Sequence, residues 1–312
     1  MLLVFGLPWL EEQGRKPETR GDLRQRYAKE TVTVNGTAYR QRQNLTTILL
    51  LGIDEPAQSA DDTGDYRSGG NADFLRLIVI DSAEKTISQI QIDRDTIVPV
   101  TVLNLIGERM DPRPMQIALS HSYGDGKELS CALTAEAVSR LLLGTPVPCY
   151  AAVSLDGIAA LNDFVGSVTV PIDDDFSGID PSMIRGTSLR LTGQQAEHFV
   201  RSRADLPVAT NEARMARQQV YFSRLTDIIR EQLKDGPAYL DALLDVMSPY
   251  LVTNMARSKL ADTAWRARDY ERLPLIPLPG SHEVGSTGYM EFQPDGDALA
   301  RIVLDTFYRP MD

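Results

Sequence analysis

The chain has 312 residues, of which 43% are hydrophobic and 24% are charged. These proportions are ordinary for a folded protein, and they exclude a disordered, collagen-like or disulfide-dense chain. The formal net charge is -11, from 32 Lys and Arg residues against 43 Asp and Glu residues. This acidity argues against a nucleic-acid binder, which needs a basic face to neutralise phosphates. An anionic ligand would therefore have to meet a local basic cluster.

The most apolar end of the chain is residues 1–10, which Pro8 interrupts and Glu11 follows. This stretch is shorter than the roughly 18 apolar residues that a membrane-spanning helix needs. Two interpretations of residues 1–29 stay open. They are either the end of a spanning helix, missing or truncated here, followed by a membrane-proximal linker, or a plain N-terminal tail.

Strand patterns open the folded part of the chain. Asn35-Gly36 is a strong turn signal and predicts a hairpin between residues 31–34 and 37–39. The continuous apolar run 47–53 predicts a strand buried on both faces. Two further strands are predicted at 74–81 and 86–93.

After residue 93, helix and strand patterns alternate. Thr192 and Gln195 form a capping-box sequence and Asn211 suits an N-cap, so these two positions mark helix starts. Helices are predicted at 114–122, 131–143, 155–165, 193–201, 211–234, 238–247, 258–268 and 297–307, and short strands at 150–154, 167–172 and 273–277. The mixture predicts an α/β fold with a central mixed β-sheet sandwiched by helices on both faces. We expect one domain over 30–312, with its core motifs in 45–230 and a C-terminal extension at 235–312.

The two cysteines, Cys131 and Cys149, stand at opposite ends of a predicted helix and its following loop. At about 1.5 Å per helical residue, their Cα atoms would lie beyond the reach of a disulfide. The sequence therefore predicts two buried free cysteines.

Common enzyme signatures are absent from the sequence. There is no Gly-rich dinucleotide fingerprint, no phosphate loop and no His-Glu-x-x-His motif, and His121, His198 and His282 are scattered. Residues 173–180 begin like a calcium loop, but Ile184 stands where the bidentate glutamate belongs. We expect a solvated acidic loop there.

Arginines gather near the start of one predicted helix. Arg201 and Arg203 end the preceding helix, and Arg214, Arg217 and Gln218 share one face of the next. The guanidinium group is permanently charged and forked, which suits bidentate contact with phosphate oxygens. Taken alone, this segment is equally consistent with arginines that pair with neighbouring acids on a solvated face.

A second group of charged residues stands where predicted strands begin and end. Asp54 follows the strand 47–53, Asp73 precedes the next, and Arg94-Asp95 follows the third. Open α/β sheets bind ligands beyond the carboxyl ends of their strands, so these residues are expected in one cleft. Asp54 and Asp73 could share Mg²⁺, which takes one or two carboxylates together with phosphate and water. As isolated residues they could equally be capping or turn-forming acids.

In this order, the motifs resemble the LytR-CpsA-Psr family over roughly residues 45–230. The resemblance is carried by Asp54, Asp73, Arg94-Asp95-Thr96, Tyr123-Gly124, residues 161–168 and 191–196, Arg201, Arg203 and the segment Arg214 to Gln218. No single motif is specific, whereas the ordered set is.

The resemblance implies an enzyme on the outer face of the bacterial cytoplasmic membrane, held by an N-terminal anchor. It would transfer a glycan phosphate from a polyprenyl-pyrophosphate carrier to a hydroxyl of peptidoglycan. It further implies that Arg94, Arg201, Arg203, Arg214 and Arg217, supported by Gln218, hold the pyrophosphate, and that Asp54 and Asp73 hold Mg²⁺. Asp95 would either accept the attacking proton or orient Arg94. Such chemistry needs positioning and charge neutralisation, with no Ser, Cys or His nucleophile.

Some positions depart from the family pattern. Asn71 stands where the family has an arginine, so one arginine is missing unless Arg67 or Arg76 substitutes for it. Asp93 replaces a proline and places an extra negative charge beside the site, and Asn211 replaces an acid. These departures imply either a different substrate or reduced activity.

Two other functions therefore stay open. One is a non-catalytic envelope sensor or scaffold that binds a polyprenyl phosphate. The other is a cytosolic domain whose arginines are surface charge.

Overall fold

The computed structural model describes residues 31–34, 36–55, 69–104, 106–202 and 210–311. The segment 1–29, Arg67 and Arg203 lie outside the described residues. In the described part of the chain, no helix combines the length and the apolar character that crossing a membrane requires.

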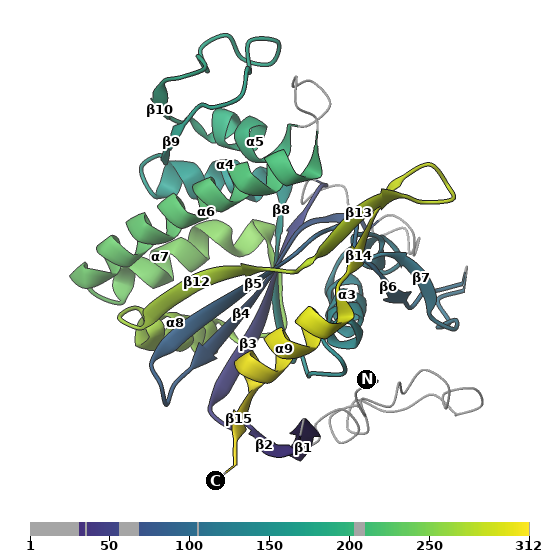
Figure 1. Cartoon of the computed structure of the whole chain (residues 1–312). Helices are drawn as coiled ribbons and strands as arrows, with labels where there is room; N and C mark the ends of the chain where they lie inside the picture. Colours follow the sequence, from purple (N-terminus) through teal and green to yellow (C-terminus); the bar gives the residue numbers. More distant parts are fainter. Residues whose placement is uncertain (1–30, 35, 56–68, 105, 203–209, 312) are drawn as a thin grey trace.

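A six-stranded sheet forms the centre of the molecule, in the order β11-β8-β3-β4-β5-β12 (Figure 1). Its strands are β3 (Leu45–Ile53), β4 (Ala72–Asp81), β5 (Thr86–Ile92), β8 (Cys149–Ser154), β11 (Leu251–Thr253) and β12 (Glu271–Pro277). Strand β3 runs antiparallel to β4 and parallel to β8, and β5 runs parallel to β12. The predicted mixed sheet is therefore confirmed.

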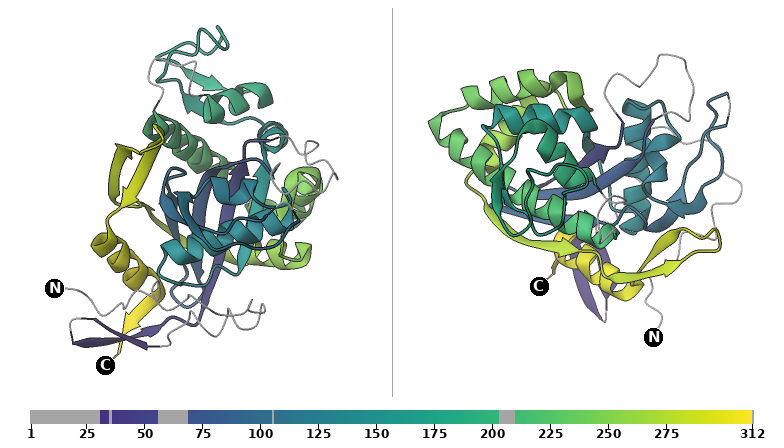
Figure 2. Two further views of the ribbon diagram at one scale, coloured as in Figure 1. Left: turned by 90° about the vertical axis from the view of Figure 1, so that its right-hand side faces the viewer. Right: turned by 90° about the horizontal axis from the view of Figure 1, so that it is seen from above.

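Helices cover both faces of this sheet (Figure 2). They are α2 (Leu119–Ser122), α3 (Glu128–Leu141), α4 (Leu155–Phe164), α5 (Gly193–Arg201), α6 (Asn211–Gln232), α7 (Ala238–Met247), α8 (Arg257–Ala267) and α9 (Gly296–Phe307), with 3-10 turns at Leu233–Asp235 and Ser248–Tyr250. Successive strand residues point to opposite faces. Leu49 accordingly belongs to one buried cluster with Val138 of α3 and Val303 of α9, while Ile48 belongs to another with Met255, just before α8, and Leu260 of α8 packs against it. The predicted sandwich is confirmed.

Four small sheets flank the central sheet in the described residues. They are formed by β1 (Thr31–Val34), β2 (Thr37–Gln41) and β15 (Tyr308–Pro310); by β6 (Ile97–Val100) and β7 (Arg113–Gln116); by β9 (Thr169–Pro171) and β10 (Ser188–Arg190); and by β13 (Gly280–Val284) and β14 (Met290–Pro294). The hairpin predicted at 31–39 is confirmed, as are the capping box of Thr192 and Gln195 and the first helical residues of α5 and α6. The N-cap of α6 is Thr210, so the prediction that Asn211 caps this helix is wrong, because the Asn211 side chain bonds Arg214 and Asp93 instead.

The helix predicted at 114–122 is wrong over its first half. Residues 113–116 form β7, and only the single turn α2 is helical. Pro114 lies opposite Pro99 in the two-stranded β6-β7 ribbon, where a missing N–H does not interrupt a sheet interior. The apolar and polar residues of this segment also fit a helical period, so the sequence did not indicate the edge strand.

Cys131 and Cys149 do not form a disulfide, as predicted. Cys131 is fully buried in α3, and burial raises the pKa of its thiol to about 12. Cys149 opens β8 and is only half-buried, so the prediction of burial is wrong for this residue. Its position at the end of the sheet gives it a partly open side.

The strand register brings three junctions to one end of the sheet. Ile53 at the end of β3 pairs with Ala72 at the start of β4, and Leu75 pairs with Ile92 at the end of β5. The residues that flank these positions therefore converge. The C-terminal strand β15 lies at the opposite end of the sheet (Figure 1).

Candidate functional site

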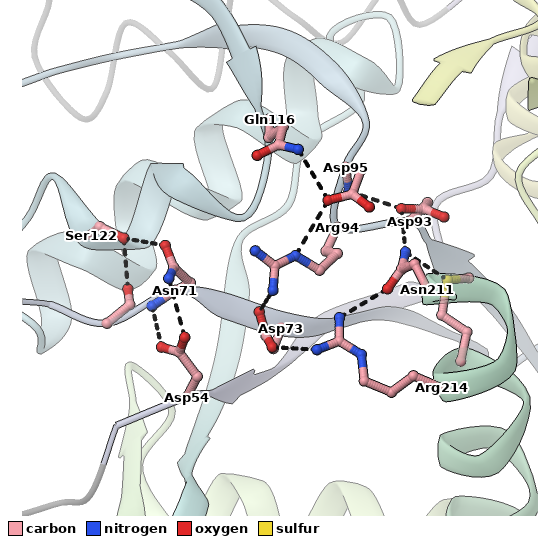
Figure 3. Close-up of polar contacts among 12 residues, drawn as sticks. Asp54, Asn71, Asp73, Asp93, Arg94, Asp95, Gln116, Ser122, Asn211 and Arg214 are labelled. Carbon is pink, nitrogen blue, oxygen red and sulfur yellow. Dashed lines mark hydrogen bonds and ion pairs between the residues drawn. The ribbon is translucent and has the colours of Figure 1, made fainter. Parts of the chain in front are cut away.

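Asp73 lies at the centre of a charged cluster at this end of the sheet (Figure 3). One carboxylate oxygen accepts a hydrogen bond from Nη1 of Arg94, and the other accepts one from Nη1 of Arg214 at 2.5 Å. The side chain of Arg214 is only 3% exposed, and that of Asp73 is 20% exposed. The predicted convergence of Asp73, Arg94 and Arg214 is thus found in the structure.

The start of α6 aims Arg214 at Asp73. Thr210 caps the helix by accepting a hydrogen bond from the Ala213 N–H at 3.2 Å. Asn211 then accepts from Nη2 of Arg214 at 2.9 Å, and its amide donates to Asp93 Oδ1 at 2.7 Å. Asn211 therefore joins α6 to the end of β5. An acid at this position would place a second carboxylate against Asp93.

Asp95 holds Arg94 from the other side. Its Oδ1 lies 3.4 Å from Nε of Arg94 and accepts a hydrogen bond from Gln116 at 3.1 Å. The Asp95 N–H donates to Asp93 Oδ1 at 2.8 Å, and this local turn fixes the backbone on both sides of Arg94. Asp95 and Asp93 are both buried.

Asp54 is held by the turn that leads into β4. Its two oxygens accept from the backbone N–H and the side-chain amide of Asn71, at 2.5 and 3.1 Å. Gly70 precedes Asn71 at φ +64°, where a Cβ would also lie 2.7 Å from the side chain of Glu55. Ser122 donates to Asn71 Oδ1 at 2.8 Å. Asn71 is therefore engaged with Asp54, and it does not replace the arginine that the family pattern places there.

Arg217 and Gln218 donate hydrogen bonds to backbone carbonyls at the end of α5. Arg217 donates through Nε to Phe199 O at 2.9 Å, and it also bonds Ser202 O and pairs with Asp174. Gln218 donates to Val200 O at 3.2 Å. These bonds satisfy carbonyls that the last turn of a helix leaves without partners. The assignment of Arg217 and Gln218 to pyrophosphate stays a prediction.

Arg201 and Arg76 make contacts outside the cluster around Asp73. Arg201 is 56% exposed and pairs with Glu197 of its own helix at 3.5 Å, and Arg203 lies outside the described residues. Arg76 is fully buried between the rings of Phe74 and Phe222, 5.0 and 4.5 Å from their centroids. Burial lowers the pKa of Arg76 to about 10. It is therefore part of the interior of the molecule.

Sequence reasoning missed one partner of the site. His282 of β13 lies with Nε2 at 2.9 Å from Asp93 Oδ2, so Asp93 turns part of its charge toward the C-terminal hairpin β13-β14. The hairpin also contacts the site through Met290 O, which accepts from Gln116 at 2.6 Å. Residues about 190 positions apart leave no local signal of such a contact, and the family motifs end before it.

Comparison with protein families identifies the chain. The model of the LytR_cpsA_psr family matches residues 12–305, which is most of the chain. The chain belongs to this family. The resemblance predicted from the ordered motifs is therefore confirmed.

Curated relatives carry names from cell-wall synthesis. The chain is 26% identical over 266 residues to the polyisoprenyl-teichoic acid–peptidoglycan teichoic acid transferase TagU of Bacillus mycoides, covering 83% of this chain and 77% of the relative. It is 27% identical over 254 residues to the cell wall biosynthesis protein LcpA of Corynebacterium glutamicum, covering 72% of this chain and 46% of LcpA.

Solved structures show the same fold. B. subtilis TagV aligns with a TM-score of 0.66 at 22% identity, covering 85% of this chain and 98% of TagV. A structure of TagT bound to LI-WTA aligns with a TM-score of 0.62 at 20% identity, covering 85% of this chain and 90% of TagT.

Proposed function

We propose that this member of the LytR-CpsA-Psr family is a cell-envelope phosphotransferase. It moves a glycan phosphate from a polyprenyl-pyrophosphate carrier to a hydroxyl of peptidoglycan, on the outer face of the bacterial cytoplasmic membrane. Relatives named as teichoic acid transferases support a role in cell-wall glycopolymer transfer. The observation that carries the proposal is the pair of guanidinium groups, Arg94 and Arg214, that face one carboxylate at the ligand-binding end of the sheet.

The carboxylate of Asp73 occupies the position that we assign to the substrate's anion. It lies between Arg94 and Arg214 and bonds one oxygen to each, as a pyrophosphate oxygen pair would. On this proposal, pyrophosphate replaces Asp73 as the partner of both arginines. Asp73 then turns its oxygens to the side facing Asp54.

Mg²⁺ is the metal ion that the family resemblance implies, and the donors suit it. Asp54 and Asp73 offer hard carboxylate oxygens from neighbouring strand ends, and Mg²⁺ needs only one or two carboxylates beside phosphate and water. Each of these oxygens already accepts one hydrogen bond but has a further lone pair. When bound, Mg²⁺ would neutralise charge on the phosphate oxygens.

The reaction needs no covalent intermediate on the protein. The oxygen of the acceptor hydroxyl attacks the phosphorus that bears the glycan, and the bond from this phosphorus to the bridging oxygen breaks. Polyprenyl phosphate leaves, and its phosphate takes up the proton that the hydroxyl loses. Arg94 and Arg214 stabilise the charge on the phosphate oxygens. The 3.4 Å contact of Asp95 with Arg94 supports an orienting role for Asp95, which is one of its two roles considered from sequence.

The test is incubation of the full chain with a polyprenyl pyrophosphate, with and without Mg²⁺, measuring lipid binding and phosphate release. Arg94→Ala and Arg214→Ala are expected to lose binding and release, by about a hundredfold for a group that stabilises the transition state. Arg266→Ala is the matched control, because Arg266 is 74% exposed and pairs with Asp262 of its own helix, α8.

The outcomes separate the candidate functions. Magnesium-dependent release that both variants lose supports the transferase. Binding without release supports the non-catalytic sensor. Binding that survives both substitutions would contradict the assignment of the arginines.

A further inference from the structure

Two buried carboxylates and one imidazole meet beside the arginine cluster. Asp93, Asp95 and His282 each offer one ligand atom, and these atoms all lie within 4.8 Å of one another. Strand β14 holds the β13-β14 hairpin against the segment after β5, because the Phe292 N–H donates to Asp95 O at 2.9 Å and Thr96 forms a bridge with Phe292. The cluster thus joins the segment after β5 to a hairpin nearly 190 residues later.

The imidazole ring of His282 lies between two carboxylates. Nδ1 is 2.9 Å from Glu212 Oε1, and Nε2 is 2.9 Å from Asp93 Oδ2. A neutral imidazole has one N–H, and a carboxylate only accepts hydrogen bonds. With the proton on Nδ1, Nε2 presents a lone pair to the lone pairs of Asp93. With the proton on Nε2, the same contact between lone pairs arises at Glu212. One more cation, either a second proton or a metal ion, is therefore needed to make both contacts favourable.

The surroundings favour a metal ion over a proton. A proton bridges two atoms, whereas here a carboxylate oxygen of Asp95 is the third ligand atom within reach. Asn211 and the Asp95 N–H occupy Oδ1 of Asp93, which directs Oδ2 to His282. A carboxylate on the far nitrogen, here that of Glu212, is the usual partner that orients a metal-binding histidine.

We propose that Asp93, Asp95 and His282 form a site for a divalent transition-metal ion such as Mn²⁺ or Zn²⁺. The imidazole nitrogen distinguishes this site from the Asp54 and Asp73 pair, because Mg²⁺ and Ca²⁺ prefer oxygen ligands alone. The ion would fasten the β13-β14 hairpin to the segment that carries Arg94. This inference does not rest on the proposed transferase function.

The experiment titrates the chelator-treated full chain with Mn²⁺ alone in an excess of Mg²⁺, which saturates oxygen-only sites. Calorimetry is expected to show one Mn²⁺ bound, and pulsed electron paramagnetic resonance is expected to show coupling to one imidazole nitrogen. His282→Gln should remove this coupling and weaken binding by more than tenfold. Glu212→Gln should weaken binding by about 10- to 100-fold, as outer partners of metal ligands do.

Control variants keep the test decisive. Glu212 is 61% exposed, so Glu212→Gln can be compared at an intact fold, verified by circular dichroism. His198→Gln, on α5, should leave both the affinity and the nitrogen coupling unchanged. The proposal would be overturned if neither Mn²⁺ nor Zn²⁺ binds. It would also be overturned if Mn²⁺ binds without nitrogen coupling and this binding is abolished by Asp54→Asn. Neither result depends on phosphate release.

Discussion

Replacing Asp73 by asparagine tests whether this carboxylate occupies the place of a substrate anion. The substitution keeps the shape of the side chain and removes its charge. Arg94 and Arg214 would then be left without the carboxylate that each of them bonds in the structure. The side chains of Arg94 and Arg214 are 14% and 3% exposed, so water cannot fully replace the lost partner.

The size of the effect follows from this burial. Breaking a fully buried ion pair costs about 3–5 kcal/mol, because it leaves an uncompensated charge. Asp73 is 20% exposed, which lowers the cost of breaking its ion pairs, so we expect Asp73→Asn to reduce the free energy of unfolding by about 2–4 kcal/mol. Pyrophosphate at a hundred times its Kd would stabilise the folded variant by about 2.7 kcal/mol.

The assay is urea unfolding of both proteins with and without inorganic pyrophosphate, in the absence of Mg²⁺. Pyrophosphate should stabilise Asp73→Asn more than the unsubstituted chain, since its arginines are no longer paired. Glu136→Gln is the matched control: Glu136 is also 20% exposed and also pairs with two arginines, Arg109 and Arg140, on a different part of the molecule. Equal responses to pyrophosphate in all three proteins would refute the reasoning.

Three further predictions concern groups outside the arginine cluster. Burial lowers the pKa of Arg76 from 12.5 to about 10, and this shift corresponds to a cost of roughly 3 kcal/mol for keeping the buried group charged. Arg76→Met removes this cost but also the hydrogen bonds of Arg76 to glutamines, so it should raise the free energy of unfolding, measured in urea, by about 1–2 kcal/mol. Desolvation opposes ionisation of Asp81, but two backbone N–H groups and Arg42 outweigh it and lower its pKa; the stability this carboxylate contributes is thus present above its unfolded pKa and lost as the pH falls through the folded value. Urea unfolding at several pH values should show Asp81→Asn less stable by about 1 kcal/mol at pH 7 and equal to the unsubstituted chain in strong acid. Iodoacetamide at pH 8 should modify Cys149 and spare Cys131, whose pKa burial raises to about 12, as peptide mass spectrometry would show.

Local signals predicted much of the fold. The capping box at Thr192 and Gln195 gave the start of α5, because its two reciprocal hydrogen bonds depend only on residues three apart. The apolar run 47–53 gave β3, since a strand between two others must be apolar on both faces. The β6-β7 ribbon and the β13-β14 hairpin were missed, because short strands at the periphery alternate too weakly to be told from loops or helix ends.

The candidate site was predictable in part for the same reason. Asp73 and Arg94 stand beside strand ends that the sheet brings together, so order along the chain was sufficient for them. Arg214 lies in α6, and only the family resemblance assigned it to the same site. The partner of Arg217 was not predictable, because Asp174 comes from a loop whose path no pattern indicates. Likewise, Asp93 looked like an extra charge beside the site until the structure placed His282 against it.

The most direct test of the proposed function is release of polyprenyl phosphate from a polyprenyl-pyrophosphate-linked glycan by the full chain, with and without Mg²⁺. We predict magnesium-dependent release that Arg94→Ala and Arg214→Ala abolish and that Arg266→Ala retains. Release that is unchanged in Arg94→Ala and Arg214→Ala would contradict the account.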